Sequence, residues 1–148
     1  MYKRILVGVD GSTTSLRGLD EAIRLAKAFD GKLLLVHVVN ELLSGDIAAY
    51  DKVIASLREA GAKVLEQAVT HVRQSEVTCD HKLLNAVGER PADLIVQEAK
   101  AWPADLIVLG THGRRGIKRL ALGSDAELVL RMSPVPVLLI RDQPEMPQ

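Results

Sequence analysis

Apolar residues along the chain fall into short continuous runs, separated by longer segments in which they recur every three or four positions. Short apolar runs are typical of strands in a parallel sheet, because a strand covered by helices on both faces has no polar side. A run that alternates between apolar and polar residues also predicts a strand, the third in chain order. The five predicted strands are 4–9, 32–39, 77–84, 106–109 and 135–140.

The segments between these strands carry helical periodicity and residues that begin or end helices. Residues 10–15 combine a turn with capping hydroxyls, and Asp30 with Gly31 forms a stop signal. The polar residues 40–50 are expected to form a surface loop. The helices predicted from these patterns span residues 16–29, 53–74, 88–100 and 123–132.

The alternation of five strands with four helices predicts the fold. Because crossovers between parallel strands are right-handed, we expect an α/β fold with a doubly wound five-stranded parallel sheet, strand order 3-2-1-4-5, and helices on both faces. A single domain is expected over residues 1–142, followed by a flexible tail at 143–148. The sequence Pro-Ala-Asp-Leu-Ile-Val occurs twice, and we assign its copy at 91–96 to a helix and its copy at 103–108 to a strand.

Composition excludes several classes of protein. The 148 residues include 19 basic and 19 acidic ones, so no overall charge attracts a nucleic acid or an anionic membrane. Aromatic residues amount to 3%, too few for a platform that stacks bases. Cys79 is the one cysteine, so no disulfide can form within the chain, and we expect it to be inert. No apolar run is long enough to span a bilayer, which favours a cytoplasmic protein.

The candidate site lies where this fold binds ligands, beyond the carboxyl ends of the strands near the point at which strand order reverses. Asp10, Val38 and the segment that begins at Gly110 are expected there. Gly123 and Ser124 open the last helix, whose free amides could bind an anion. Between Asp105 and Asp125 there are four cations and no acid; the cations are Arg114, Arg115, Lys118 and Arg119. The alternative interpretation is a solvated basic loop beside an ordinary helix start.

These glycines also carry a family resemblance. Gly110, Gly113, Gly123 and Ser124 match the pattern G-x-x-G, nine residues, G-[ST], of the ATP-binding universal stress proteins. The residues 5–12, 104–113 and 134–140 resemble the same family, in the same order along the chain. The resemblance implies ATP binding with Mg²⁺ or Mn²⁺ and a role in the stress response.

The resemblance also implies roles for individual residues. Val9 and Asp10 would lie against adenosine, with Asp10 able to approach a metal on the phosphates, and Val38 would contact adenine. Gly110 and Gly113 would make room for ribose and phosphates, and Gly123 and Ser124 would bind the phosphate chain. The full predicted set is Val9, Asp10, Val38, Leu109, Gly110, Gly113, Arg114, Gly123, Ser124 and Asp125.

One residue departs from the family pattern. Asp125 stands where relatives commonly have valine, and a carboxylate beside the phosphate-binding serine should repel a triphosphate unless it shares a metal. Ser124 through Glu127 can also be interpreted as a capping box, in which Ser124 only caps the last helix. The alternative function is therefore an interaction protein of the same fold that does not bind nucleotide.

The remaining candidates predict no catalytic site. His37 is expected to be partly buried with its hydrogen bonds satisfied, His71 and His81 are isolated, and His112 lacks a nucleophile motif. We therefore expect a nucleotide-dependent regulator with at most slow ATP hydrolysis. Pro136 marks 135–140 as an edge strand, through which the resemblance implies a homodimer.

Overall fold

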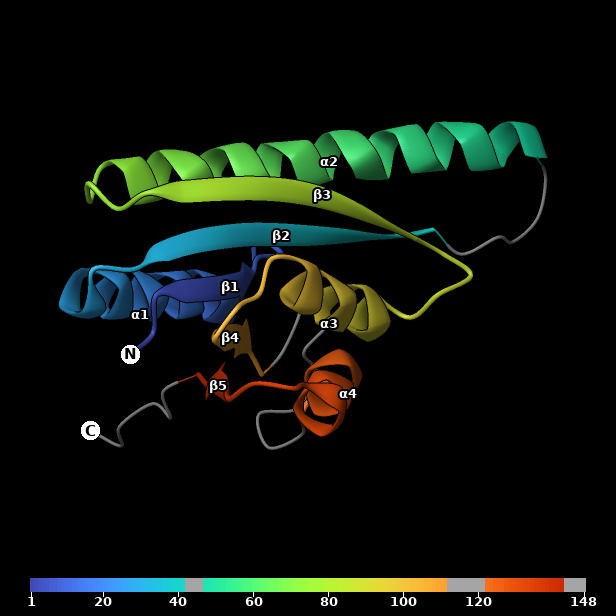
Figure 1. Ribbon diagram of the computed structural model, residues 1–148. Helices are drawn as coiled ribbons and strands as arrows, with labels where there is room; N and C mark the ends of the chain where they lie inside the picture. The colour runs from blue at the N-terminus through green and yellow to red at the C-terminus, as the bar shows by residue number, and fades with distance from the viewer. Residues whose placement is uncertain (42–46, 112–121, 143–148) are drawn as a thin grey trace, which may run out of the picture.

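The computed structural model describes residues 1–41, 47–111 and 122–142, and for residues 47 and 48 it describes the backbone alone. Five parallel strands form one sheet in the order β3-β2-β1-β4-β5 (Figure 1). The strands are β1 (Arg4–Gly8), β2 (Lys32–Glu41), β3 (Cys79–Val87), β4 (Leu106–Gly110) and β5 (Val137–Ile140). The predicted number, direction and order of the strands are confirmed. The predicted tail at 143–148 lies outside the described residues.

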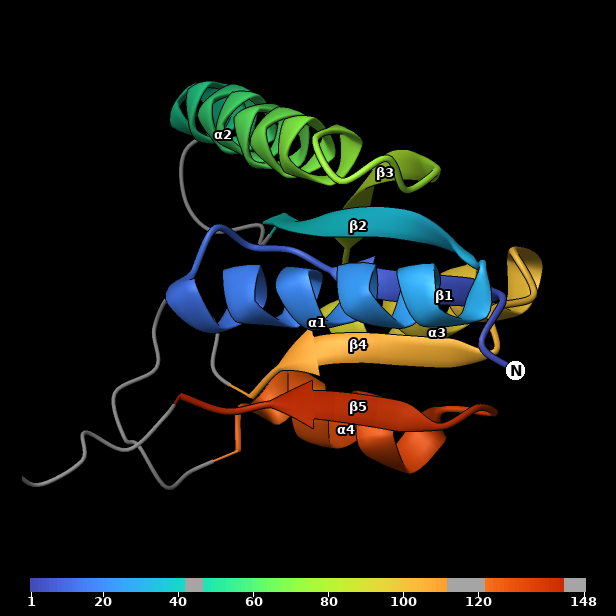
Figure 2. The same cartoon turned by 90° about the vertical axis from the view of Figure 1, so that its left-hand side faces the viewer.

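Four helices cover the two faces of this sheet. Helices α1 (Thr13–Phe29) and α2 (Ile47–Arg73) lie on one face, and α3 (Pro91–Ala101) and α4 (Ser124–Met132) lie on the other (Figure 2). Side chains of β1 divide between two buried clusters: Ile5 and Val7 pack under α1 and α2, whereas Leu6 packs with α3. This division explains why the strands have continuous apolar runs. The prediction of a doubly wound sheet is confirmed.

Several predicted boundaries differ from those observed. The first helix begins at Thr13 instead of residue 16, and the fifth strand, predicted over 135–140, spans Val137–Ile140. The loop expected at 40–50 is wrong at both ends, because β2 continues to Glu41 and α2 begins at Ile47. Glu41 continues the strand although it is charged, because its carboxylate is buried against the Arg58 guanidinium of α2. The helix predicted from residue 88 begins at Pro91, since Gly88 has a positive φ of 73° that no helix contains. The third strand is shifted to Cys79–Val87.

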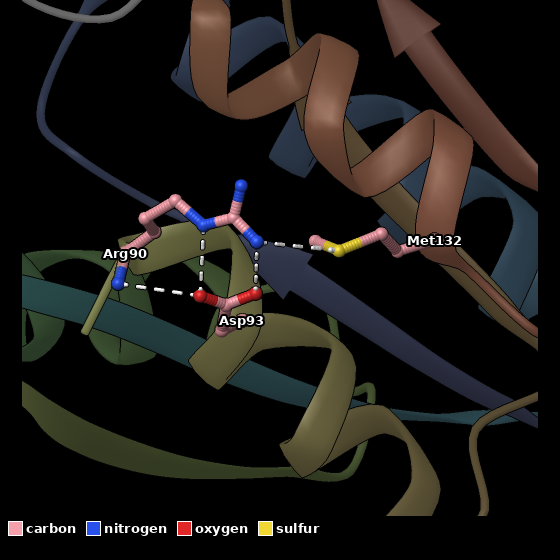
Figure 3. A network of polar contacts seen from close by, with 3 residues as sticks. All are labelled: Arg90, Asp93 and Met132. Carbon is pink, nitrogen blue, oxygen red and sulfur yellow. Dashed lines mark hydrogen bonds and ion pairs between the residues drawn. The ribbon is translucent and has the colours of Figure 1, made fainter.

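A polar contact joins the start of α3 to the end of α4 (Figure 3). The Arg90 guanidinium donates two hydrogen bonds of 3.0 Å to the two carboxylate oxygens of Asp93. Its Nη2 also lies 3.9 Å from the sulfur of Met132. The ion pair lowers the pKa of the Asp93 carboxyl below its ordinary value, chiefly through the Arg90 hydrogen bonds.

The sheet has two edges of different character. The edge strand β3 contains the exposed polar residues Asp80, His81 and Lys82, whereas all four residues of β5 are apolar and half-buried. Charged residues on an edge strand oppose pairing with another chain. No helix within the described residues has the length and hydropathy of a membrane span.

Candidate functional site

The β1–α1 turn is held rigidly at the carboxyl edge of the sheet. The Val9 amide donates to the Val36 carbonyl at 2.8 Å, and the Asp10 amide donates to the Ser15 hydroxyl at 3.0 Å. The Asp10 carboxylate accepts from the Ser12 amide at 2.8 Å, which forms an Asx turn and fixes the side chain. Asp10 is therefore held in one orientation before any ligand arrives.

The end of β4 lies beside this turn and also meets the start of α4. The Gly123 amide donates to the Thr111 carbonyl at 2.7 Å, so the chain returns to the end of β4 immediately before α4. A Cβ atom at Gly110 would lie 3.0 Å from the Thr14 hydroxyl oxygen and 3.2 Å from the Ser15 amide nitrogen. Glycine at position 110 thus allows the start of α1 to approach β4. The strand order reverses between β1 and β4, where open α/β sheets bind ligands.

Two helices, α1 and α4, begin beside the strand-order reversal, and they differ in how the amides of their first turns are satisfied. Helix α1 is capped by Ser12, whose side chain accepts from the Ser15 amide at 3.2 Å. Helix α4 has Gly123 at its N-cap and no side-chain cap. Within the described residues, no side chain caps the first-turn amides of α4, so these amides are the candidates for binding an anion.

The capping box predicted for Ser124 is wrong. Ser124 is the first helical residue rather than the cap, and it is exposed. Glu127 instead accepts a hydrogen bond of 2.8 Å from Arg131, one turn further along α4. A capping box needs the glutamate three residues after the cap, and Glu127 lies four residues after Gly123. Within the described part of the chain, no side chain or backbone group partners the Ser124 hydroxyl.

Asp125 lies in the first turn of α4, next to Ser124. Its side chain is exposed and has no ion-pair partner among the described residues. Partial burial nevertheless raises the pKa of the Asp125 carboxyl above its ordinary value. The charged form is thus disfavoured at this position, and phosphate groups nearby would disfavour it further.

The other described members of the predicted set lie on both sides of the sheet. Val9 is buried among residues under α1 and α2, whereas Leu109 is buried and Val38 half-buried on the face covered by α3. Buried side chains offer a ligand mainly their backbone atoms. The structure thus brings Val9, Asp10, Leu109, Gly110 and the α4 start to one edge. Gly113 and Arg114 lie outside the described residues, as do Arg115, Lys118, Arg119 and His112.

The edge also offers a carboxylate to a metal that arrives with phosphates. No group of three potential metal ligands occurs within the described residues. Mg²⁺ is commonly held by one or two carboxylates together with the phosphates of a nucleotide. One oxygen of Asp10 is engaged by Ser12, so Asp10 fits as a single ligand to such an ion.

Two contacts were missed in the sequence. The His37 ring nitrogen Nδ1 lies 2.7 Å from the Val9 carbonyl oxygen, which confirms that this histidine is partly buried and satisfied but adds a partner within the site. His71, predicted to be isolated, instead pairs with Asp20 at 2.6 Å between α2 and α1. In both cases the partner is distant in sequence, so only the packing of helices and strands reveals it.

Burial raises the pKa of the Cys79 thiol, in keeping with the prediction that it is inert.

The fold places the chain among the open, doubly wound α/β proteins, which bind ligands where the strand order reverses. Comparison with known proteins identifies the family. The chain belongs to the universal stress protein family, whose model matches residues 1–141. It is 33% identical over 144 residues to a universal stress protein of Methanocaldococcus jannaschii, an alignment that covers 95% of this chain and 83% of the relative.

Solved structures agree with this assignment. The universal stress protein UspA of Lactobacillus plantarum superposes with a TM-score of 0.81 at 29% identity, covering 95% of this chain and 98% of that one. A universal stress protein of Archaeoglobus fulgidus in complex with dAMP matches with a TM-score of 0.69 at 26% identity, covering 95% and 98%. One solved in complex with cAMP matches with a TM-score of 0.69 at 27% identity, covering 95% and 97%.

Proposed function

We propose that this chain binds an adenine nucleotide, ATP with Mg²⁺ or Mn²⁺, at the carboxyl edge between β1 and β4, and acts in the cytoplasm as a nucleotide-dependent regulator of the stress response. The observation that carries the proposal is the N-terminus of α4, where Gly123 stands at the N-cap and no side chain among the described residues caps the first-turn amides. Phosphate groups bind such amides because the helix dipole and the N–H donors both favour negative charge.

The residues around the α4 terminus support a nucleotide rather than a free anion. Gly123 hydrogen-bonds to Thr111 at the end of β4, so α4 begins beside the strand-order reversal at which Asp10 also lies. The two relatives solved with dAMP and cAMP favour an adenine nucleotide as the class of ligand. Gly113, which the resemblance places beside the ribose and phosphates, and Arg114, a cation of the basic segment after β4, belong to the proposed site.

We expect hydrolysis to be slow at most. General-base catalysis needs a group within hydrogen-bond reach of the attacking water. At the described edge, the Asp10 carboxylate is already engaged by the Ser12 amide, and His37 is engaged by the Val9 carbonyl. Binding and release of nucleotide, rather than turnover, would then change the state of the protein.

Thermal unfolding with and without nucleotide tests the proposal. A ligand that binds the native state stabilises it, by about 2.7 kcal/mol at 100 times its dissociation constant. ATP with Mg²⁺ should raise the melting temperature, and AMP and cAMP should be compared with it, while FMN and NAD serve as controls. No shift with any adenine nucleotide at millimolar concentration would refute the proposal.

Two variants localise the binding. Gly123→Val should abolish the shift, because a side chain at the N-cap obstructs the approach to the α4 amides. Ser124→Ala should weaken it, whereas Ser75→Ala, beyond the C-terminus of α2 at the opposite edge of the sheet, should bind as the wild type does. Circular dichroism should show that each variant is folded.

The alternative function is an interaction protein of the same fold without nucleotide. The Asp125 carboxylate favours it, because it places negative charge in the first turn of α4. A folded wild-type protein that shows no shift with any of the nucleotides would support this alternative.

A further inference from the structure

The His37 imidazole closes a hydrogen-bond clamp around the peptide that joins Val9 to Asp10. Its Nδ1 lies 2.7 Å from the Val9 carbonyl oxygen. A carbonyl oxygen can only accept, so Nδ1 carries the proton and donates. On the other side of the same peptide, the Asp10 amide donates to the Ser15 hydroxyl at 3.0 Å. The peptide is thus held at both its polar atoms, from β2 and from α1.

The register of the sheet explains why the Val9 carbonyl accepts a hydrogen bond from a side chain rather than from a backbone amide of β2. β1 and β2 are paired up to Gly8 and Val36, and the Val9 amide donates once more, to the Val36 carbonyl. In a continuing parallel ladder the Val9 carbonyl would accept from the Val38 amide. The His37 imidazole takes this carbonyl, and Asp10 begins the turn toward α1.

Helix α2 is shaped to admit the ring. A Cβ atom at Gly61 would lie 2.7 Å from the His37 Cδ2 and 3.0 Å from its Nε2. It would also lie 2.9 Å from the Cδ1 atom of Leu83 on β3, so a side chain at position 61 would meet both the ring and Leu83. Any side chain at position 61 would therefore push the imidazole off its place. Gly61 and His37 form one unit that couples α2 to the candidate site.

We propose that His37 is a positioning residue for nucleotide binding, which fixes the Val9–Asp10 peptide in the orientation that the ligand needs. This inference rests on the proposed function. It assigns to Val9 and Asp10 a prearranged geometry, and preorganised groups lose less entropy when they bind. His37 itself need not touch the nucleotide.

Substitutions at position 37 separate positioning from simple stability. His37→Leu keeps apolar volume and removes the donor, and we expect ATP with Mg²⁺ to bind about five- to tenfold more weakly, the range that one hydrogen bond is worth. His37→Asn retains an N–H near the place of Nδ1 and should restore affinity to within about threefold. Affinity is measured by calorimetry well below the melting temperature of each variant.

A second variant acts on the clamp from α2, and a matched control on α1 does not. Gly61→Ala should weaken nucleotide binding in the same way, because the added methyl displaces the ring. Gly18→Ala is the matched control, since its Cβ would have only ordinary contacts of 3.6 Å with Ile140 and Val108. Alanine favours a helix over glycine, so Gly18→Ala should bind nucleotide normally and melt no lower than the wild type.

Nitrogen NMR of the imidazole checks the clamp without nucleotide. In the free protein the His37 shifts should show the tautomer protonated at Nδ1. A His37→Leu variant that binds as tightly as the wild type overturns the positioning role, as does loss of affinity in His37→Leu that His37→Asn does not restore. A wild-type protein with the expected tautomer that binds no nucleotide overturns the proposed function, and with it the role of the clamp in binding.

Discussion

At the carboxyl ends of β1 and β4, where the candidate site lies, the role of a residue depends on contacts that local sequence patterns do not contain. The glycine spacing singles out Gly110 and Gly123: a Cβ atom at Gly110 would meet Thr14 and Ser15 at the start of α1, and Gly123 is the N-cap of α4. The role of Ser124 was ambiguous in the sequence, since a cap and a phosphate ligand use the same hydroxyl. Ser124 is not the cap, because α4 begins one residue earlier than a Ser124 cap requires, and local sequence does not determine helix ends to that precision.

Asp125 gives the first prediction at this scale. Replacing Asp125 with Asn removes a negative charge beside the proposed phosphate site, so ATP should bind about fivefold more tightly, corresponding to about 1 kcal/mol between nearby charges in water. Calorimetry with ATP and Mg²⁺ at neutral pH measures the difference. Unchanged or weaker binding in Asp125→Asn would show that the carboxylate points away from the phosphates or shares their metal.

The pH dependence of this difference follows from the raised pKa of Asp125. A carboxyl whose pKa is higher in the folded than in the unfolded protein stabilises the fold at pH values below its unfolded pKa, and this contribution is lost as pH rises through the folded pKa. At acid pH the group is neutral, so the affinities of the wild type and Asp125→Asn should converge. Comparing the two proteins cancels the titration of the nucleotide itself.

Helices and strands were predicted better than the contacts between them. The repeated hexapeptide shows the limit of local sequence: its first copy lies in α3, which begins at Pro91, and its second copy leads into β4. Both copies begin with proline, so proline does not distinguish them, whereas helical periodicity continues only after the first copy. The residues that follow each copy, rather than the hexapeptide, therefore decided the structure.

Contacts that cross between helices and strands could not be predicted from periodicity. Glu41 is buried only because Arg58, seventeen positions along the chain, lies over it on α2. His37 meets Val9 because β2 and β1 are in register. Such pairs depend on tertiary packing. A polar residue at the end of a buried strand therefore predicts that it has a partner, but the sequence does not predict which residue the partner is.

The ion pair between Arg90 and Asp93 gives a prediction at the scale of helices. Arg90 lowers the pKa of Asp93, so the pair stabilises the fold above the unfolded pKa of the carboxyl, and the contribution is lost as pH falls through the lower folded pKa. Asp93→Asn should therefore melt at a lower temperature than the wild type at neutral pH. The two should converge at strongly acid pH.

Thermal unfolding followed by circular dichroism measures this difference, with Glu21→Gln as the matched control. Glu21 pairs with Arg24 at the same three-residue spacing on the exposed face of α1, away from any helix start. Because exposed pairs contribute little, Glu21→Gln should melt close to the wild type. A neutral-pH melting temperature of Asp93→Asn equal to that of the control would contradict a role for the pair in α3.

At the scale of the whole molecule, the outermost strands of the sheet, β3 and β5, differ in whether they can pair with a second chain. β5 is short, apolar and half-buried, and its paired side faces β4. β3 is longer but presents Asp80, His81 and Lys82, which oppose pairing with a second sheet. If two copies associate through a sheet edge, β5 is therefore the edge that favours it, in agreement with the homodimer that the family resemblance implies.

We therefore predict a homodimer formed through β5. Val137→Lys or Leu139→Lys should convert the protein to monomers, because each places a charge in an apolar interface that has no partner for it. His81→Glu alters the charge on the opposite edge and should leave the dimer intact. Light scattering at micromolar concentration measures the mass of each; a monomeric wild type would refute the dimer, and a β5 variant that stays dimeric while His81→Glu dissociates would assign the interface elsewhere. If nucleotide binding is then measured on the monomeric variant, an unchanged affinity would place the whole site within one chain, as the edge between β1 and β4 requires.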